Sequence, residues 1–226
     1  KHGGLTYFVV PIKSNLGKSV DVQPLIKMTG ETGFNEVRFE SLEIDDKYRL
    51  DEIGNGWAVA QTTLLHERSA GPLVSPKSEG AGGSEDESEY GELTSLIDLA
   101  KSNYSNGEPS VENPLIRDEL MQLLIRYEGF EQNQRRGRVA ELCDHPLRIP
   151  LQWKLVITEI AQEAGNLSMQ IEGAASSLFI ADDNSLNGGQ SPLAYMNSFG
   201  MTIAGGTSEI LRNILGEKVL GLPKSK

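Results

Sequence analysis

The chain has 226 residues, of which 38% are hydrophobic, and this is enough to bury a core in one large or two small domains. Its formal net charge of −11 would repel phosphate backbones, so nucleic acid is not expected as a partner. No stretch approaches the roughly 18–20 apolar residues of a membrane span. Cys143 is the only cysteine and the histidines are scattered, so we expect no internal disulfide, no metal site and a cytoplasmic location.

The N-terminal part of the chain is rich in strand-forming residues. Residues 5–10 predict a first strand, residues 20–23 a second that stops at Pro24, and residues 34–39 a third that leads into residues 42–44. Several short strands at close spacing predict part of a β-sandwich or barrel. Because the run of strands begins abruptly, we interpret the first residue as a truncation point.

After a turn at residues 51–56, the apolar residues recur at helical spacing. The expected helices cover residues 57–68, 93–100, 120–130, 153–174, 193–203 and 207–220. Residues 75–91, which are rich in Ser, Gly and acidic residues, and residues 103–114 are predicted to be loops. The Asn-Gly-Gly at residues 187–189 is expected to interrupt the last helices.

Strands followed by helices long enough to pack side by side predict an α+β protein. We expect a partial antiparallel β-domain over residues 1–55 and an up-and-down α-helical bundle over residues 56–226. Large side chains such as Met28, Trp57 and Trp153 are expected in the core rather than against a cofactor.

Three segments, taken in order, resemble the acyl-CoA dehydrogenase family. Residues 24–39 (PLIKMTGE and FNEVRF) are similar to the closing strands of that family's middle β-domain. Residues 54–68 (GNGWAVA and LHER) resemble the entry into its C-terminal helical domain. Residues 203–223 (IAGGTSEILRN and EKVLGLP) resemble the tail of many bacterial members. The resemblance implies the end of the middle domain and the whole C-terminal domain, without the front half of the enzyme.

The family oxidises the Cα–Cβ bond of an acyl-CoA thioester, with a carboxylate base that removes the α-proton and FAD that accepts the hydride. In many members the base is a Glu immediately before the Gly-Thr of the last motif, where this chain has Gly205. Members similar to the isovaleryl and long-chain enzymes carry the base in the first helix of the C-terminal domain, which implies Glu67. Arg68 is implied to orient Glu67 or hold the substrate. The alternative is that both are ordinary solvated helix residues.

The last motif is implied to contribute to the cofactor site. In the family, the residues that match Thr207 and Glu209 contact the adenosine side of FAD, and Gly206 permits close approach of the backbone. The alternative for this segment is simple capping, in which Thr207 or Ser208 satisfies free N–H groups at the start of the last helix. The two roles are compatible.

The sequence departs from the family pattern in two segments that concern subunit assembly. Symmetric flavin-binding tetramers carry an Arg-x-Phe-Gly segment and a glycine-rich segment after Gln-Ile, and both segments reach the flavin of a neighbouring subunit. Neither is clear here, because residues 170–174 (QIEGA) lack the paired glycines. The pattern resembles bacterial members that form mixed assemblies, in which one subunit supplies only part of each site.

The resemblance therefore implies an FAD-dependent acyl-CoA dehydrogenase that shares its FAD across a subunit interface, as a homo- or hetero-oligomer (dimer or tetramer), with an electron-transferring flavoprotein as electron acceptor. We expect the chain to be inactive by itself. The alternatives are a non-catalytic partner subunit of a hetero-oligomeric dehydrogenase and a helical interaction module without enzymatic role. An oxidase on the same scaffold also stays open, because oxygen reactivity depends on access to the flavin.

Overall fold

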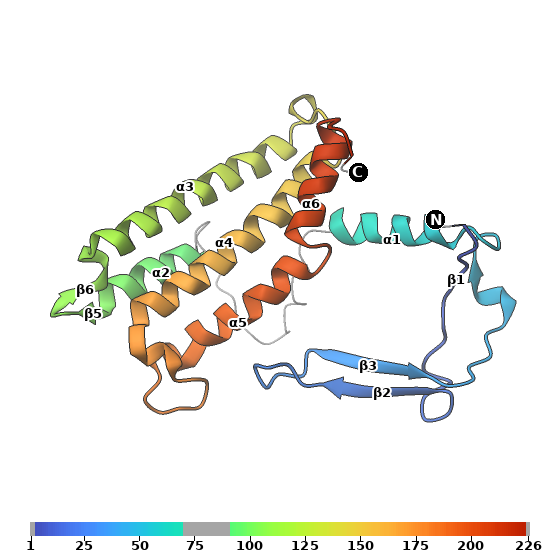
Figure 1. Ribbon diagram of the computed structural model, residues 1–226, viewed down its shortest axis with the longest axis horizontal. Coiled ribbons are helices and arrows are strands. Elements are labelled where there is room, and N and C mark those ends of the chain that lie inside the picture. Colours follow the sequence, from blue (N-terminus) through green and yellow to red (C-terminus); the bar gives the residue numbers. More distant parts are fainter. Residues whose placement is uncertain (1–2, 70–90, 225–226) are drawn as a thin grey trace. The chain divides into compact units, whose positions relative to one another are not determined.

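The computed structural model describes residues 3–69 and 91–224, apart from the side chains at positions 65, 67–69 and 91–92. Within these residues the predicted order is confirmed: short antiparallel strand pairs come first and long helices follow (Figure 1).

The chain divides into two compact units, Lys1–Ser69 and Ala70–Lys226. The first contains the strands and one helix, and the second contains the bundle. The domain limits proposed from the sequence, residues 1–55 and 56–226, stay a prediction.

The first unit is built from two separate strand pairs. Its elements are β1 (Tyr7–Phe8), β2 (Val20–Leu25), β3 (Phe34–Phe39), the 3-10 helix η1 (Asp46–Tyr48), β4 (Arg49–Leu50) and α1 (Gly56–Ser69). Strand β2 pairs antiparallel with β3, and β1 pairs antiparallel with β4. The strand expected at residues 42–44 does not form; the chain instead returns to β1 through β4.

Pro24 does not end the second strand, as the sequence suggested, but lies inside it opposite Asn35. The amide of Glu40 donates to the carbonyl of Ser19, so the Ser19–Glu40 pair is hydrogen-bonded. Hydrogen-bonded and non-hydrogen-bonded pairs alternate along an antiparallel ladder, which makes Pro24–Asn35 a non-hydrogen-bonded pair. The proline nitrogen therefore faces the free edge of the ribbon, where no N–H is needed.

Much apolar surface of the first unit is open to solvent. Met28, expected in the core, is 83% exposed, and Phe34 on β3 is 65% exposed. A two-stranded ribbon cannot bury both of its faces by itself, and exposed apolar patches of this kind mark surfaces that other protein covers. The first unit is therefore a partial β-structure, as expected.

The start of α1 is held against the first strand by a glycine. The amide of Gly56 donates to the carbonyl of Leu5 at 2.7 Å. A Cβ built on Gly56 would lie 2.7 Å from backbone atoms of Thr6 and Tyr7, so a larger residue would push the helix away from the strand. The segment predicted as a loop after this helix, residues 75–91, lies outside the described residues except for its last position.

The second unit contains the predicted helices. Its α-helices are α2 (Gly91–Ser102), α3 (Pro114–Gly137), α4 (Arg148–Glu172), α5 (Gln190–Ile203) and α6 (Ser208–Ile214). Its other elements are the strands β5 (Tyr104–Ser105) and β6 (Glu108–Pro109), the 3-10 helices η2 (Ser110–Glu112), η3 (Ala140–Leu142), η4 (Gly173–Ser177) and η5 (Leu186–Gly189), and the π-helical turn η6 (Leu215–Val219).

The predicted loop at residues 103–114 contains a small hairpin. Strands β5 and β6 pair antiparallel around Asn106 and Gly107, whose φ angles are 55° and 86°. Asn-Gly is the preferred sequence for a turn with two positive φ angles, so the sequence held a hairpin signal that the loop prediction missed.

Two apolar clusters hold the bundle together. The larger contains Leu93, Leu96 and Ala100 of α2, Leu120 and Leu123 of α3, and Ile160, Leu167 and Ile171 of α4. The smaller contains Leu151 and Leu155 of α4 and Leu211 of α6. Helix α4 therefore carries residues of both clusters, and α3, α4 and α5 lie side by side (Figure 1).

Helix α5 approaches α4 closely at Gly165, where a Cβ would lie 3.1 Å from the Cα of Tyr195. Helix α4 ends at Gly173, which has a φ of 58° and a ψ of −130°, so the fourth helix stops before Ala174 and not after it. The Asn-Gly-Gly break at residues 187–189 is confirmed, with a positive φ at each residue.

The last helix differs in register from the prediction. Ile210 and Leu220, two of the apolar residues whose spacing predicts the helix over residues 207–220, are 47% and 57% exposed, whereas Leu211 is fully buried. The π-helical turn from Leu215 to Val219 changes the spacing of side chains, so a continuous 3.6-residue period does not describe this segment.

We expect Leu211→Ala to lower the free energy of unfolding by about 2–5 kcal/mol, because it opens a cavity between α4 and α6. Leu115→Ala is the matched control, since Leu115 is 73% exposed and its truncation should cost little. Denaturant titration followed by circular dichroism measures both. Equal losses in the two variants would contradict the proposed role of the smaller cluster.

A buried carboxylate lies where α4 meets α5. Glu172 is 6% exposed and its Oε1 accepts a hydrogen bond from the hydroxyl of Ser191, which is 5% exposed. Its Oε2 has no hydrogen-bond partner among the described residues. The hydrogen bond from the Ser191 hydroxyl is therefore the main local interaction that offsets the free-energy cost of burying the Glu172 carboxylate.

Ser191→Ala should cost about 1.5–3 kcal/mol of stability, because it leaves the buried carboxylate without its donor. The same change in a Glu172→Gln background should cost less, since a neutral amide is cheaper to bury. Ser177→Ala, at an exposed hydroxyl that bonds to its own helical turn, serves as the control. A double-mutant cycle by urea unfolding checks the coupling; additive losses would contradict it.

Candidate functional site

The candidate site is built around the turn between α5 and α6. Helix α5 ends at Ile203, and Gly205 and Gly206 follow with φ angles of 66° and 111°. Glycine adopts such angles without the steric penalty that a side chain brings. A Cβ built on Gly205 would meet no described atom within 4 Å, so the space in front of this residue is open.

Thr207 caps the last helix. Its backbone is extended, with φ −64° and ψ 159°, and its Oγ1 accepts from the amide of Ile210 at 3.3 Å. The capping alternative for this residue is therefore confirmed. The contact of Thr207 and Gly206 with FAD stays a prediction, and the half-buried position of both residues leaves them partly accessible.

Glu209 lies in the first turn of α6 with its carboxylate in solvent. A hydrogen bond from its own backbone amide lowers its pKa below the usual value, and the hydroxyl of Thr207 and the charge of Arg212 act in the same direction. The carboxylate is therefore ionised at neutral pH and can accept hydrogen bonds from hydroxyl groups.

We expect Thr207→Val to raise the pKa of Glu209 toward its ordinary value, because the substitution removes a hydroxyl donor and leaves the backbone amide. The lowered pKa contributes stability above the pKa of the unfolded chain, and this contribution is lost as the pH falls through the folded pKa. NMR titration of the Glu209 carboxyl carbon measures the change. Thr62→Val, whose hydroxyl bonds to Ala58 of α1, is the control, and an unchanged titration in the Thr207 variant would contradict the assignment.

Helix α4 contacts the turn between α5 and α6 through the side chain of Lys154. Lys154 Nζ donates to the carbonyl of Gly206 at 2.8 Å and to that of Thr202 at 3.3 Å. Arg212 of α6 pairs with Glu159 of α4 at 2.6 Å, with both groups partly exposed. The sequence analysis did not single out Lys154. Its spacing, three residues after Leu151 and four before Thr158, places it on one helix face with them, and this was the available signal.

Glu67 and Arg68, the predicted base and its neighbour, lie in the last turns of α1. Their side chains are outside the described residues, and α1 belongs to a different compact unit from the turn at Gly205. Their roles stay predictions. At Gly205 the structure supplies no carboxylate, because the residue has no side chain.

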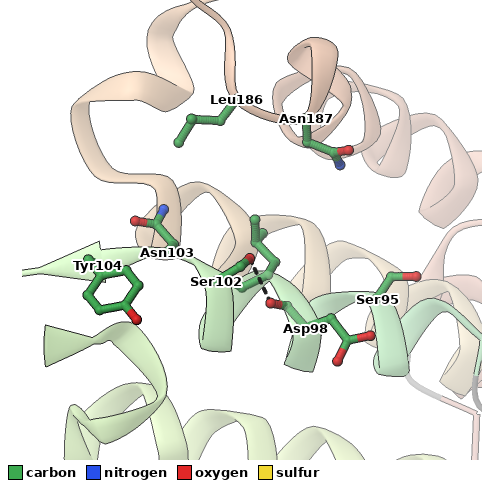
Figure 2. Close-up of a pocket in the computed structure, with 8 residues that line it drawn as sticks. Ser95, Asp98, Ser102, Asn103, Tyr104, Leu186 and Asn187 are labelled. Atoms are coloured by element: carbon green, nitrogen blue, oxygen red, sulfur yellow. Dashed lines mark hydrogen bonds between the residues drawn. The ribbon is translucent and has the colours of Figure 1, made fainter.

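A cavity of about 610 Å³ lies between the end of α2 and η5 (Figure 2). Figure 2 shows Leu186 and Asn187 on one side, opposite Ser95, Asp98 and Ser102 of α2. The cavity is close to residues 170–174, one of the segments that depart from the symmetric family pattern, because Asn103, which lines it, donates to the carbonyl of Ile171 at 2.9 Å.

The lining of this cavity is poorly suited to a phosphate group. Its residues are Ser95, Asp98, Leu99, Ser102, Asn103, Tyr104, Leu186 and Asn187. Within the described part of the chain, the lining thus offers an acidic side chain and neither lysine nor arginine. An anion would gain no ion pair here and would meet the charge of Asp98.

A second cavity, of about 240 Å³, lies between α3 and α4. It is lined by Phe130, Trp153 and the amides Gln134 and Gln152, among other residues. The Nε2 of Gln134 and the Oε1 of Gln152 are buried without hydrogen-bond partners among the described residues. Buried polar atoms of this kind are commonly satisfied by ordered water, and the cavity is large enough to hold it.

Neither a membrane span nor a metal site is found in the part of the chain that the structure describes. Its helices are too short or too polar to cross a bilayer. Over residues 3–69 and 91–224, no three side chains of the His, Cys, Asp or Glu type gather closely enough to hold a metal ion.

Comparison with known proteins places the helical unit in a family. The family model described as "Acyl-CoA dehydrogenase, C-terminal domain" matches residues 90–220, which is more than half of the 226 residues. Acyl-CoA dehydrogenase IpdE1 of Mycolicibacterium smegmatis is 28% identical over 225 residues, which cover 99% of this chain and 50% of that protein. The chain thus spans about half the length of the curated relatives it matches.

Solved structures show the same fold. The crystal structure of the ChsE4-ChsE5 complex from Mycobacterium tuberculosis matches with a TM-score of 0.73 and 21% identity, over 99% of this chain and 53% of the other. The Tcur3481-Tcur3483 steroid ACAD matches with a TM-score of 0.72 and 20% identity, over 99% and 53% of the two chains. Sequence identities of 20–21% support a shared fold and no further property.

Proposed function

The chain belongs to the acyl-CoA dehydrogenase family, and we propose that it is part of an FAD-dependent enzyme that oxidises the Cα–Cβ bond of an acyl-CoA thioester. The observation that carries the proposal is the family match over the helical unit, together with the glycine turn and the Thr207 cap held on α4.

Glu67 is the proposed catalytic base. The α-proton of a thioester is only weakly acidic, so its removal needs a positioned carboxylate whose pKa is raised by burial. Gly205 supplies no such group at the position that many family members use. The resemblance of the LHER segment then leaves Glu67 on α1 as the candidate, with Arg68 beside it to orient the carboxylate or bind the substrate.

The turn at Gly205 and Gly206 is the proposed contact for the adenosine side of FAD. Its residues fit such a group: the space before Gly205 is open, and the ionised carboxylate of Glu209 can accept from ribose hydroxyls. Thr207 holds that carboxylate through its hydroxyl while it caps the helix. FAD, when bound, would supply the acceptor for the β-hydrogen and its electron pair.

A mixed assembly with a second subunit is the proposed state of the enzyme. The ChsE4-ChsE5 relative is a complex of two different chains, and the described lining of the cavity between α2 and η5 has no basic residue that could pair with a neighbour's cofactor phosphates. A bulky acyl group, such as the steroid named for the Tcur3481-Tcur3483 relative, is the proposed substrate class. The electron-transferring flavoprotein as acceptor and the cytoplasmic location stay predictions.

One alternative keeps a specific observation in its favour. Because Gly205 cannot act as a base, a solvated Glu67 would make this chain a non-catalytic partner subunit. The family membership argues against the other alternative, a helical interaction module unrelated to enzymes.

Glu67→Gln in the full-length parent protein, purified with its partner subunit, tests the proposal. We expect the flavin of the wild type to bleach on addition of acyl-CoA, and the rate of bleaching to fall by at least about 10²-fold in the variant, because a general base contributes that much. Glu119→Gln, at an exposed acid on α3, should bleach like the wild type.

Stopped-flow absorbance at the flavin band gives the rates, and acyl-CoA binding is measured separately. Equal bleaching in the Glu67 variant and the wild type would assign the base to the partner subunit. A wild type without flavin would contradict the proposed cofactor.

A further inference from the structure

The side chain of Lys154 connects the two ends of the turn between α5 and α6. It projects from α4, and its Nζ reaches the carbonyl of Thr202 in the last turn of α5 and that of Gly206 immediately before Thr207. Both contacts are partly buried. A cation that donates to two carbonyls is a stronger restraint than a neutral donor.

The contact with Thr202 completes the end of α5. The last carbonyls of a helix have no partner within the helix. Here the carbonyl of Gly200 accepts from Ala204 N at 2.9 Å, and that of Ile203 accepts from Gly206 N at 3.2 Å. The carbonyl of Thr202 accepts a hydrogen bond from Nζ of Lys154, which belongs to the neighbouring helix α4. The lysine therefore acts as part of the C-terminal cap of α5.

The contact with Gly206 restrains the part of the turn that consists of two glycines. Gly205 and Gly206 are adjacent, and glycine loses more conformational freedom on folding than any other residue. The apolar cluster at Leu211 and the Arg212–Glu159 pair hold the body of α6, which begins after Thr207. Among the bonds described above, only those of Lys154 connect both the last turn of α5 and Gly206 to α4.

We propose that Lys154 is a positioning residue that fixes the Gly205–Gly206 turn on α4 and so sets the placement of Thr207 and Glu209. The proposal rests on the proposed function in so far as those residues contact FAD. Lys154 itself acts through the turn. Loss of its Nζ should loosen the turn first and weaken FAD binding as a consequence.

The test uses the full-length parent protein with its partner subunit and three variants. Lys154→Met removes the charge and the donors at similar length, and Lys154→Arg keeps both. Lys101→Met is the control, because the ion pair of Lys101 with Asp98 is long, at 3.9 Å, and exposed to solvent. Hydrogen exchange of the amides of Gly206, Leu120 and Leu167 is measured in the flavin-free protein, and FAD affinity by titration of flavin fluorescence.

In Lys154→Met we expect about tenfold faster exchange at Gly206 and about tenfold weaker FAD binding, which corresponds to about 1.4 kcal/mol. Exchange at Leu120 and Leu167, in the larger apolar cluster, should stay unchanged and report that the bundle is folded. Lys154→Arg should recover most of both effects, and Lys101→Met should show neither.

Unchanged exchange at Gly206 in Lys154→Met would overturn the proposal. Faster exchange with unchanged FAD affinity would also overturn it, because the turn would then not position the cofactor contacts. A wild type that binds no FAD would overturn the proposed function and the cofactor part of this inference together, while the exchange result would still decide whether Lys154 holds the turn.

Discussion

The packing of Leu211 against Leu151 and Leu155 is the contact on which the candidate site depends. It attaches the last helix to the first half of α4, and Leu211 has no exposed surface. A side chain of this size gains about 1.5–3 kcal/mol from burial, more than one exposed ion pair supplies. Only when α6 is held in this way does the Gly205–Gly206 turn have two fixed ends.

Helix α4 acts as the common support of the helical unit. Its residues enter both apolar clusters, it approaches α5 at Gly165, and its polar side chains reach the end of α5 and the start of α6. Rigid elements place functional groups more accurately than loops do, and here the loop with the candidate cofactor contacts is tied to such an element. The positive φ angles of the turn require glycine, and the contacts with α4 restrain its backbone.

The chemistry available in the described residues is incomplete, and this agrees with a site assembled from more than one chain. The turn offers a capped helix and an ionised Glu209, but no base at Gly205. The described lining of the cavity between α2 and η5 has Asp98 as its charged residue, which does not favour an anionic ligand.

The sequence by itself determined the order of strands and helices and the break at residues 187–189, and it offered Thr207 as one of two candidate caps, because periodicity and capping are local. It did not determine that Pro24 lies inside a strand, that Leu211 rather than Ile210 is buried, or that Lys154 holds the turn. Those features depend on partners far along the chain: the pairing with β3, the packing of Leu211 on Leu151 and Leu155, and the bonds from Lys154 to Thr202 and Gly206. Tertiary structure decided them because a local pattern states which faces are apolar, and not which surface each face meets.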